Sequence, residues 1–330
     1  MEEKRINKTE SPEKELTKEK SIQNLEDKSY NDFDINLKYP KEELKYHSLP
    51  INCLTFLNDG RFASGSNDCT IIIYNIKTFK PDITIKEHTE CVNCLAQLSS
   101  GILVSGSDDK TIKLFNIKEN EYNLIQALSY HTDGVNKIIE LKNGRLVSCS
   151  YDKSIIIYSK ENNEYIKDFD FKTNGPNGPV IQTKENEICY YEGTDNTICF
   201  YDLNERKIIT SINNVNDACH YYDCLIMISK DLLLMTGDSR LTIINCNSHN
   251  IIRNINAPGS GNIWAACLLN DDKLLAADDN HRITQWKIEN DNLKFISKLE
   301  EAHDRAVRAL KKLGKGLIIS ADGKGVVKVW

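Results

Sequence analysis

Two cysteines form the pattern in this sequence that most resembles a reactive site, Cys91-Val-Asn-Cys94. A Cys-x-x-Cys pair can form a redox centre or supply half of a zinc site. No second pair follows at the spacing of a zinc ribbon, and the pair opens a predicted strand rather than a helix. Cys94 also aligns with Cys53, which has no such partner. We therefore interpret Cys94 as a small core residue.

Paired carboxylates are a second pattern that could do chemistry. Each pair lies in a predicted turn, where aspartate is favoured because its side chain hydrogen-bonds nearby backbone; the pairs are Asp108–Asp109, Asp271–Asp272 and Asp278–Asp279. The chain has no Gly-x-Gly-x-x-Gly motif between a strand and a helix and no Walker-type phosphate loop. We therefore predict that the protein is not an enzyme and has no cofactor or metal site.

Composition restricts the function classes further. The chain has 330 residues, a formal net charge of −6 and a sequence pI of about 5.7, which argues against an electrostatic nucleic-acid binder. No run of 18 apolar residues occurs, so we expect no membrane-spanning helix. The polar start has no apolar core of a secretory signal. We therefore expect the eleven cysteines to be reduced, in the cytoplasm or nucleus.

Residues 1–40 differ from the rest of the chain. They contain eight Lys/Arg and ten Asp/Glu, with few and irregularly spaced apolar residues. Such a segment buries too little surface to offset its ordering entropy, so we predict a disordered charged tail. Ser11-Pro12-Glu13 has the features of a helix start. A short helix that binds a partner is therefore the alternative interpretation of this tail.

From about residue 41 the chain contains an internal repeat. Three segments align without gaps and are each followed by a glycine nine residues after their first position; they begin at Ile51, Val92 and Val135. A large residue then recurs with steps of 41 to 44 residues, in the column Tyr74, Phe115, Tyr158, Tyr201, Ile244, Trp286 and Trp330. Short apolar runs of strand length separate the turn residues. Seven units of four short strands predict an all-β, seven-bladed propeller over residues 41–330.

This pattern resembles the WD40 repeat family over roughly residues 43–330. In that family a histidine, a serine or threonine, a turn aspartate and a tryptophan form a hydrogen-bonded network within a blade. The resemblance implies this structural network here for His47, Ser64 and Asp68; His88, Ser105 and Asp109; and His131, Ser148 and Asp152. The neighbouring serines 66, 107 and 150 are alternatives. In each set the histidine precedes its aspartate by 21 residues.

Several repeats depart from the family pattern. Tyrosine, phenylalanine or isoleucine replaces the tryptophan in five of seven repeats, so we expect that column to act there only as a large apolar filler. Repeat four has no matching histidine, repeat six has Asn280 at the aspartate position, and repeat seven has Lys324 there with Asp322 nearby. We therefore expect the network in repeats one to three, and leave it open in repeats four to seven.

The family arrangement also predicts how the ring closes. The last repeat ends after its third strand at Trp330, and residues 42–47 precede the first inner strand. These residues can supply the missing fourth strand of the last blade. Both ends of the propeller would then meet in one sheet, which leaves no open edge there.

The resemblance implies a rigid platform for protein partners, with the channel mouth and exposed loops as contact surfaces. Strand alternation predicts that one residue of each inner strand lines the mouth; these are Asn52, Asn93, Asn136, Ile181, Trp264 and Arg308. The turn residue before the aspartate column should be exposed on the same side; these are Asn67, Asp108, Tyr151, Thr194 and Asp279.

Trp264, Arg308 and Tyr151 are the candidate anchors for a peptide that carries an acidic group, because aromatic and arginine residues are enriched among interface hot spots. The alternative is that Trp264 packs beneath a loop. The predicted function is a non-catalytic scaffold or adaptor for protein or peptide partners, monomeric within a larger complex, without nucleic-acid binding or membrane insertion. Substrate recognition for a ubiquitin ligase and a propeller hydrolase are the alternatives.

Overall fold

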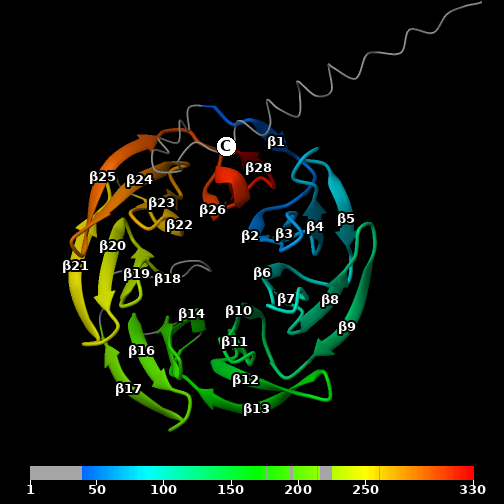
Figure 1. Ribbon diagram of the computed structural model, residues 1–330, viewed down its shortest axis with the longest axis horizontal. Helices are drawn as coiled ribbons and strands as arrows, with labels where there is room; N and C mark the ends of the chain where they lie inside the picture. Colours follow the sequence, from blue (N-terminus) through cyan, green and yellow to red (C-terminus); the bar gives the residue numbers. More distant parts are fainter. Residues whose placement is uncertain (1–38, 176, 194–195, 214, 216–224, 260) are drawn as a thin grey trace, which may run out of the picture. The chain divides into compact units, whose positions relative to one another are not determined.

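The computed structural model describes residues 39–330 apart from 176, 194–195, 214, 216–224 and 260. Within these residues the strands form seven four-stranded antiparallel sheets, arranged in a ring (Figure 1). The predicted all-β, seven-bladed architecture is therefore confirmed. Nearly all of the predicted tail, residues 1–40, lies outside the described residues.

The strands of the first four blades, from the inside outwards, are as follows. Blade one contains β2 (Ile51–Phe56), β3 (Phe62–Ser66), β4 (Ile71–Tyr74) and β5 (Pro81–Ile85). Blade two contains β6 (Val92–Gln97), β7 (Leu103–Ser107), β8 (Ile112–Ile117) and β9 (Tyr122–Leu128). Blade three contains β10 (Val135–Glu140), β11 (Leu146–Ser150), β12 (Ser154–Glu161) and β13 (Glu164–Lys172). Blade four contains β14 (Asn177–Lys184), β15 (Glu187–Glu192), β16 (Thr197–Asp202) and β17 (Lys207–Ile212).

The other three blades complete the ring. Blade five contains β18 (Leu225–Met227), β19 (Leu232–Gly237), β20 (Arg240–Asn245) and β21 (Asn250–Asn256). Blade six contains β22 (Ile263–Asn270), β23 (Lys273–Asp278), β24 (Ile283–Glu289) and β25 (Asn292–Leu299). Blade seven contains β26 (Val307–Lys312), β27 (Ile318–Asp322), β28 (Val327–Val329) and β1 (Glu42–Leu44), with the short 3-10 helix η1 (Gly314–Gly316) between β26 and β27.

The ring closes through the first strand of the fold. β1 pairs antiparallel with β28, and Glu42 lies opposite Val329 while Leu44 lies opposite Val327. An ion pair of 3.0 Å between Lys328 Nζ and Glu43 Oε1 accompanies this pairing. The predicted closure is confirmed, although the strand has three residues rather than the six of segment 42–47.

The hydrophobic core is divided among the interfaces between neighbouring blades. The cluster that joins blades seven and one includes Leu44, Ile51, Tyr74 and Val327, all of them buried. Similar clusters join each successive pair from blades one and two to blades five and six. Each blade therefore buries its apolar faces only against its neighbours, so an open ring would expose two such faces to water.

A left-handed residue closes the turn between the second and third strands of every blade. It is the residue directly after the aspartate column, with φ between 47° and 83°; the seven are Cys69, Lys110, Lys153, Asn196, Ser239, His281 and Gly325. A non-glycine residue adopts this conformation only at an energetic cost. In blade one the carboxylate of Asp68 offsets that cost, because it accepts the backbone N–H of Thr70 at 3.1 Å.

Polar side chains at the ends of three inner strands hold neighbouring blades together. Gln97 accepts the backbone N–H of Asn58 at 2.6 Å, Glu140 accepts that of Ser99 at 2.6 Å, and Gln182 accepts that of Lys142 at 2.9 Å. Each bond runs from one blade to the first turn of the preceding blade. This recurrence in the aligned repeats had not been predicted as a contact between blades.

We predict that Leu44→Ala lowers the free energy of unfolding by about 2–5 kcal/mol. The Leu44 side chain is 4% exposed and packs between the first and last blades, so its truncation leaves a cavity where the ring closes. Urea denaturation followed by circular dichroism measures the change.

The matched control is Leu49→Ala, because Leu49 is 48% exposed and its truncation should change stability by less than about 0.5 kcal/mol. Equal effects of the two substitutions would contradict the role assigned to the closing strand.

Candidate functional site: the mouth of the central channel

Blades one to three contain the same buried chain of hydrogen bonds. In blade one, His47 Nδ1 lies 2.8 Å from Asp68 Oδ2 and His47 Nε2 lies 2.7 Å from Ser64 Oγ. The corresponding distances are 2.7 and 2.6 Å in blade two, and 2.9 and 2.6 Å in blade three. The histidine, serine and aspartate residues named from the sequence are therefore brought together, with Ser64, Ser105 and Ser148 bonded to the histidines.

The alternative serines, Ser66, Ser107 and Ser150, bind the backbone of the turn instead of the histidine. In blade one the Ser66 hydroxyl accepts the backbone N–H of Asp68 at 3.1 Å, and Ser107 and Ser150 do the same for the aspartates of blades two and three at 3.0 Å. These histidine and serine side chains are nearly inaccessible to solvent, which makes them structural rather than reactive.

The turn aspartates are held in the ionised form. Burial of Asp68 by itself opposes ionisation, but hydrogen bonds from His47 and Thr70 outweigh it and keep the pKa of this carboxyl well below its usual range. The pKa values of Asp109 and Asp152 are lowered in the same way. In blade seven burial lowers the pKa of His303 below 6.5, despite the opposing hydrogen bond to Asp322.

The aromatic column does more than fill space in two blades. The hydroxyl of Tyr74 lies 3.2 Å from Ser64 Oγ, and that of Tyr158 lies 3.0 Å from Ser148 Oγ. The expectation of a purely apolar filler is therefore wrong for both tyrosines, because their hydroxyls reach the serine that an indole N–H would reach. Phe115 is fully buried and has no polar atom to do this.

Blade seven has the complete network despite its divergent sequence. His303 Nδ1 lies 3.0 Å from Asp322 Oδ2, and His303 Nε2 lies 2.6 Å from Ser320 Oγ. The indole N–H of Trp330 donates to the same serine oxygen at 2.8 Å. Asp322 stands two residues earlier than the aspartate column, but its side chain reaches the same place, which resolves the question left open for this repeat.

Blade six replaces the histidine with an arginine from another position. Gly259 stands in the histidine column, and a Cβ atom there would lie 2.0 Å from Arg282 Nη1. Arg282 Nη2 forms an ion pair of 2.6 Å with Asp278, and both side chains are buried. The guanidinium therefore occupies the space that the missing side chain leaves. Gly259 also has a φ of 102°, which favours glycine.

Five inner strands share a register shift at the same position, near their first residue. In blade one Ile51 pairs with Ser66 and Cys53 pairs with Gly65, so the pairing passes over Asn52 as in a β-bulge. The residues passed over in this way are Asn52, Asn93, Asn136, Trp264 and Arg308. Strand alternation did not predict these bulges. Ile181 in blade four instead pairs regularly with Cys189.

The three asparagines lie inside the wall rather than on its surface. They are 3%, 1% and 4% exposed. Asn52 Nδ2 donates to Asn67 Oδ1 at 2.6 Å, and Asn93 Nδ2 donates to Asp108 Oδ1 at 2.6 Å. These two amides are therefore engaged with the turns of their own blades, as expected for buried polar groups. As surfaces for a partner, Asn52, Asn93 and Asn136 are poor candidates.

Trp264 and Arg308 form the centre of the candidate site. The Arg308 guanidinium carbon lies 5.2 Å from the centroid of the Trp264 ring, which is the distance of a cation–π contact. Arg308 Nη1 also donates to Asn52 Oδ1 at 3.0 Å. Both side chains are partly exposed, so two residues from the neighbouring strands β22 and β26 form one accessible aromatic and cationic surface.

The predicted turn residues are partly exposed but lie in different sectors. Tyr151 is 42% exposed and belongs to blade three, which is three blades away from blade six in the ring. Asp279 of blade six accepts the backbone N–H of Asn262 at 2.9 Å. Thr194 lies outside the described residues. A ligand that contacts Tyr151 as well as the Trp264–Arg308 pair would therefore have to cross the mouth.

A cavity of about 360 Å³ follows the inner strands of blades seven, one, two and three. Its wall includes three ionisable side chains, Lys137, Glu140 and Lys311. We had expected asparagine, isoleucine and tryptophan to dominate the channel, and these ionisable groups were not predicted. The Glu140 carboxylate accepts both the backbone N–H and the hydroxyl of Ser99.

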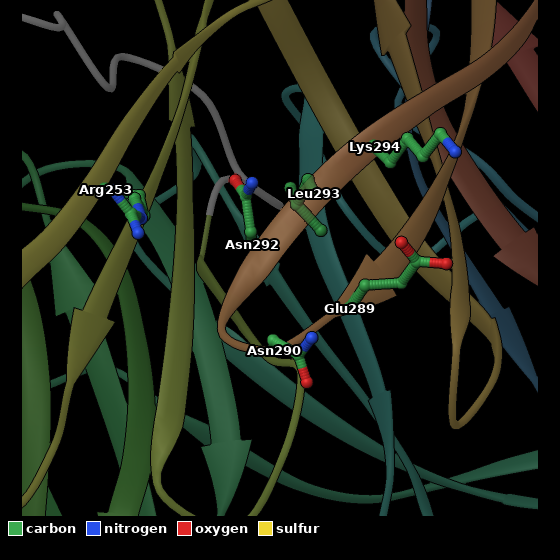
Figure 2. Close-up of a pocket in the computed structure, with 6 residues that line it drawn as sticks. All are labelled: Arg253, Glu289, Asn290, Asn292, Leu293 and Lys294. Atoms are coloured by element: carbon green, nitrogen blue, oxygen red, sulfur yellow. The ribbon is translucent and has the colours of Figure 1, made fainter.

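Other parts of the surface also have polar depressions. One of about 420 Å³ lies between blades five and six, lined by Arg253, Glu289, Asn290, Asn292, Leu293 and Lys294. Figure 2 shows Arg253 on a different ribbon from the hairpin that carries the asparagines. Its Glu289 is already paired with Lys287 at 2.7 Å. The residues described include no cluster of three or more side chains suited to hold a metal ion.

Several charged side chains of the surface form ion pairs that the sequence did not predict. Residues 303–330 contain seven Lys/Arg and two Asp/Glu. Two of these lysines are paired, Lys328 with Glu43 and Lys324 with Asp304. At the junction of blades four and five, His249 Nε2 lies 3.1 Å from the buried Glu187 carboxylate. Residues 62 positions apart form this last contact, and no local pattern could have indicated it.

A family model described as "WD domain, G-beta repeat" matches residues 38–75, 79–116 and 122–159. Blades one to three therefore carry WD40 repeats, within a closed ring of seven four-stranded blades. The family is in general made up of non-catalytic proteins that act as interaction scaffolds. No helix among residues 39–330, as far as these are described, has both the length and the apolar character needed to span a membrane.

Two solved structures show how closely the fold is shared. "Structure of U3-55K" has a TM-score of 0.74 and 16% identity, covering 87% of this chain and 97% of that one. "Crystal structure of RRP9 WD40 repeats" has the same score and identity, covering 87% and 96%. No curated protein matches the chain in sequence. At this identity the likeness establishes the fold alone.

We predict that stability falls as the pH is lowered from 7 to 3. The pKa of His303 is lower in the folded protein, so the unfolded chain takes up that proton first as the pH falls below about 6.5. The turn aspartates also have lowered pKa values, and the stability they contribute above their unfolded pKa of about 3.8 is lost below it. Urea midpoints measured across this range test the expected decline.

Asp152→Asn should flatten the decline below about pH 4, because the substituted side chain no longer titrates. Asp291→Asn is the control, since Asp291 is an exposed turn residue. A protein that becomes more stable on acidification from pH 7 to 4 would contradict this account of the network.

Proposed function

We propose that this WD40 propeller is a non-catalytic scaffold that binds protein partners at the mouth of its channel, with Trp264 and Arg308 at the centre of the contact. The observation that carries this proposal is the cation–π pair itself, in which an aromatic ring and a guanidinium from neighbouring inner strands are both partly exposed. Such residues contribute most to binding when a partner removes them from water.

The partner segment that fits this surface carries an acidic group. Arg308 supplies a cation, and Trp264 supplies a flat apolar surface beside it. The cation–π contact and the bond to Asn52 already hold the guanidinium in place, so little side-chain entropy is lost when a ligand binds. Tyr151, across the mouth, is the expected contact for a segment long enough to cross it.

We predict that the double substitution Trp264→Ala and Arg308→Glu weakens the capture of protein partners by about tenfold or more. Full-length protein is used as bait, and bound proteins are quantified by mass spectrometry against wild type. The charge reversal should repel an acidic ligand, and the loss of the indole should remove the apolar contact.

The matched control is the double substitution Lys294→Glu and Ile296→Ala, on the outer strand β25. It makes the same charge change and removes an apolar side chain that is 40% exposed, but far from the inner strands. The proposal fails if every partner remains bound to the Trp264/Arg308 variant, or if both variants lose the same partners equally.

A further inference from the structure

Arg308 differs from Asn52 and Asn93, the equivalent residues of blades one and two, because the turn of its blade provides it with no side-chain hydrogen-bond acceptor. The turn residue stands 15 positions after the bulge residue, as Asn67 does after Asn52 and Asp108 after Asn93. In both blades its side-chain oxygen accepts the amide N–H of the bulge residue at 2.6 Å. In blade seven the same position is Gly323, which has no side chain to accept a hydrogen bond.

The backbone confirms that these turn positions correspond. Asn67 donates its backbone N–H to Pro50, Asp108 donates to Cys91, and Gly323 donates to Ala306, in each case to the residue just before the inner strand. Gly323 is therefore the true counterpart of Asn67 and Asp108, and the missing acceptor is not displaced to a neighbouring residue of the turn.

Arg308 is left with an unsatisfied edge. Its Nε is buried and has no hydrogen-bond partner among the residues that the structure describes. Two other arginines with little solvent exposure have carboxylate partners: Arg61 pairs with Asp59 at 2.6 Å and Arg282 pairs with Asp278 at 2.6 Å. Arg308 forms no such ion pair with the described residues. A partly buried cation without a counterion is unfavourable.

We propose that an anionic group of the ligand, a carboxylate or a phosphate, binds beside Gly323 and accepts hydrogen bonds from the Nε and Nη2 of Arg308. This inference rests on the proposed function and specifies the chemistry of its centre. A guanidinium edge presents two parallel N–H groups that match two oxygens of such an anion. The guanidinium contacts the Trp264 ring and its Nη1 donates to Asn52, so the edge formed by Nε and Nη2 is the one without an acceptor among the residues described.

The backbone at Gly323 leaves room for a side chain. A Cβ atom built on Gly323 would lie 3.8 Å from Arg308 Nε and 3.6 Å from Arg305 Cβ, which are ordinary contact distances. Gly323 does not have a left-handed φ, so a side chain can be placed there without backbone strain. Gly323→Asp should therefore put the carboxylate of blade two into blade seven, where it would occupy the anion site from within.

The side-chain N–H resonance of Arg308 tests the proposal directly. In full-length protein labelled with ¹⁵N, the Nε–H signal is assigned by its loss in Arg308→Lys. We expect added acetate or inorganic phosphate to shift this signal saturably, whereas chloride at equal ionic strength does not. The anion that saturates at the lower concentration distinguishes a carboxylate ligand from a phosphate ligand.

Substitutions at Gly323 provide the decisive comparison. In Gly323→Asp the signal should be shifted before any anion is added, and affinity for acetate and phosphate should fall by about tenfold or more. Gly323→Ala, which adds a side chain without an acceptor, should respond as wild type does. The inference is overturned if the wild-type signal does not respond to either anion, responds equally to chloride, or responds unchanged in Gly323→Asp.

This experiment and the capture experiment can fail separately. If Arg308 binds anions but the Trp264/Arg308 variant keeps every protein partner, the scaffold proposal is wrong and the anion site stands. If partners are lost from that variant while the Arg308 signal is insensitive to anions, the mouth binds proteins by other contacts and the anion site is wrong.

Discussion

Pairing of β1 with β28 is the constraint on which the rest of this structure depends. Each blade buries its apolar faces only against its two neighbours, so the first and last blades can be covered only if they meet. Three residues of strand, Glu42–Leu44, accomplish this. Because the inner strands then surround a closed channel, Trp264 of blade six, Arg308 of blade seven and Asn52 of blade one become neighbours, although the chain separates the last two by 256 residues.

The polar network within the blades shows that a structural role can be kept while residue types change. Blades one to three have histidine, serine and aspartate in regular columns. In blade seven Asp322, which stands outside the aspartate column, reaches the blade's own histidine, His303. In blade six Arg282 fills the space of the histidine that Gly259 replaces. What is preserved is a satisfied set of buried donors and acceptors, because an unpaired member would be costly.

The channel mouth has one part whose polar side chains are bonded to each other, in blades one and two, and another part that is available for binding, in blades six and seven. In blades one and two the bulge residue and the turn residue satisfy each other, and their side chains leave little to offer a ligand. Blade seven combines a larger, charged bulge residue with a turn glycine, and blade six places an indole against it. In blade seven the Nε of Arg308 is therefore left without an acceptor among the residues described, beside the Trp264 ring.

The sequence by itself determined the number of blades, the period of the repeat, the closing strand and the three regular networks. These features depend on local strand periodicity and on residues that recur at fixed spacing, and both patterns can be identified from the sequence without coordinates. It also selected Trp264 and Arg308, because aromatic and arginine residues are enriched among interface hot spots.

The tertiary structure alone decided which of the selected residues act together. Asn52, Asn93 and Asn136 proved to be buried, and Tyr151 lies in a distant sector. The Nε of Arg308 has no acceptor among the residues described, because the turn of blade seven has a glycine there. Tyrosine hydroxyls, Arg282 and the Glu187–His249 contact took roles that no local pattern marked. The reason is physical: burial and hydrogen-bond satisfaction depend on side chains from neighbouring blades, and their positions are set only when the ring is closed.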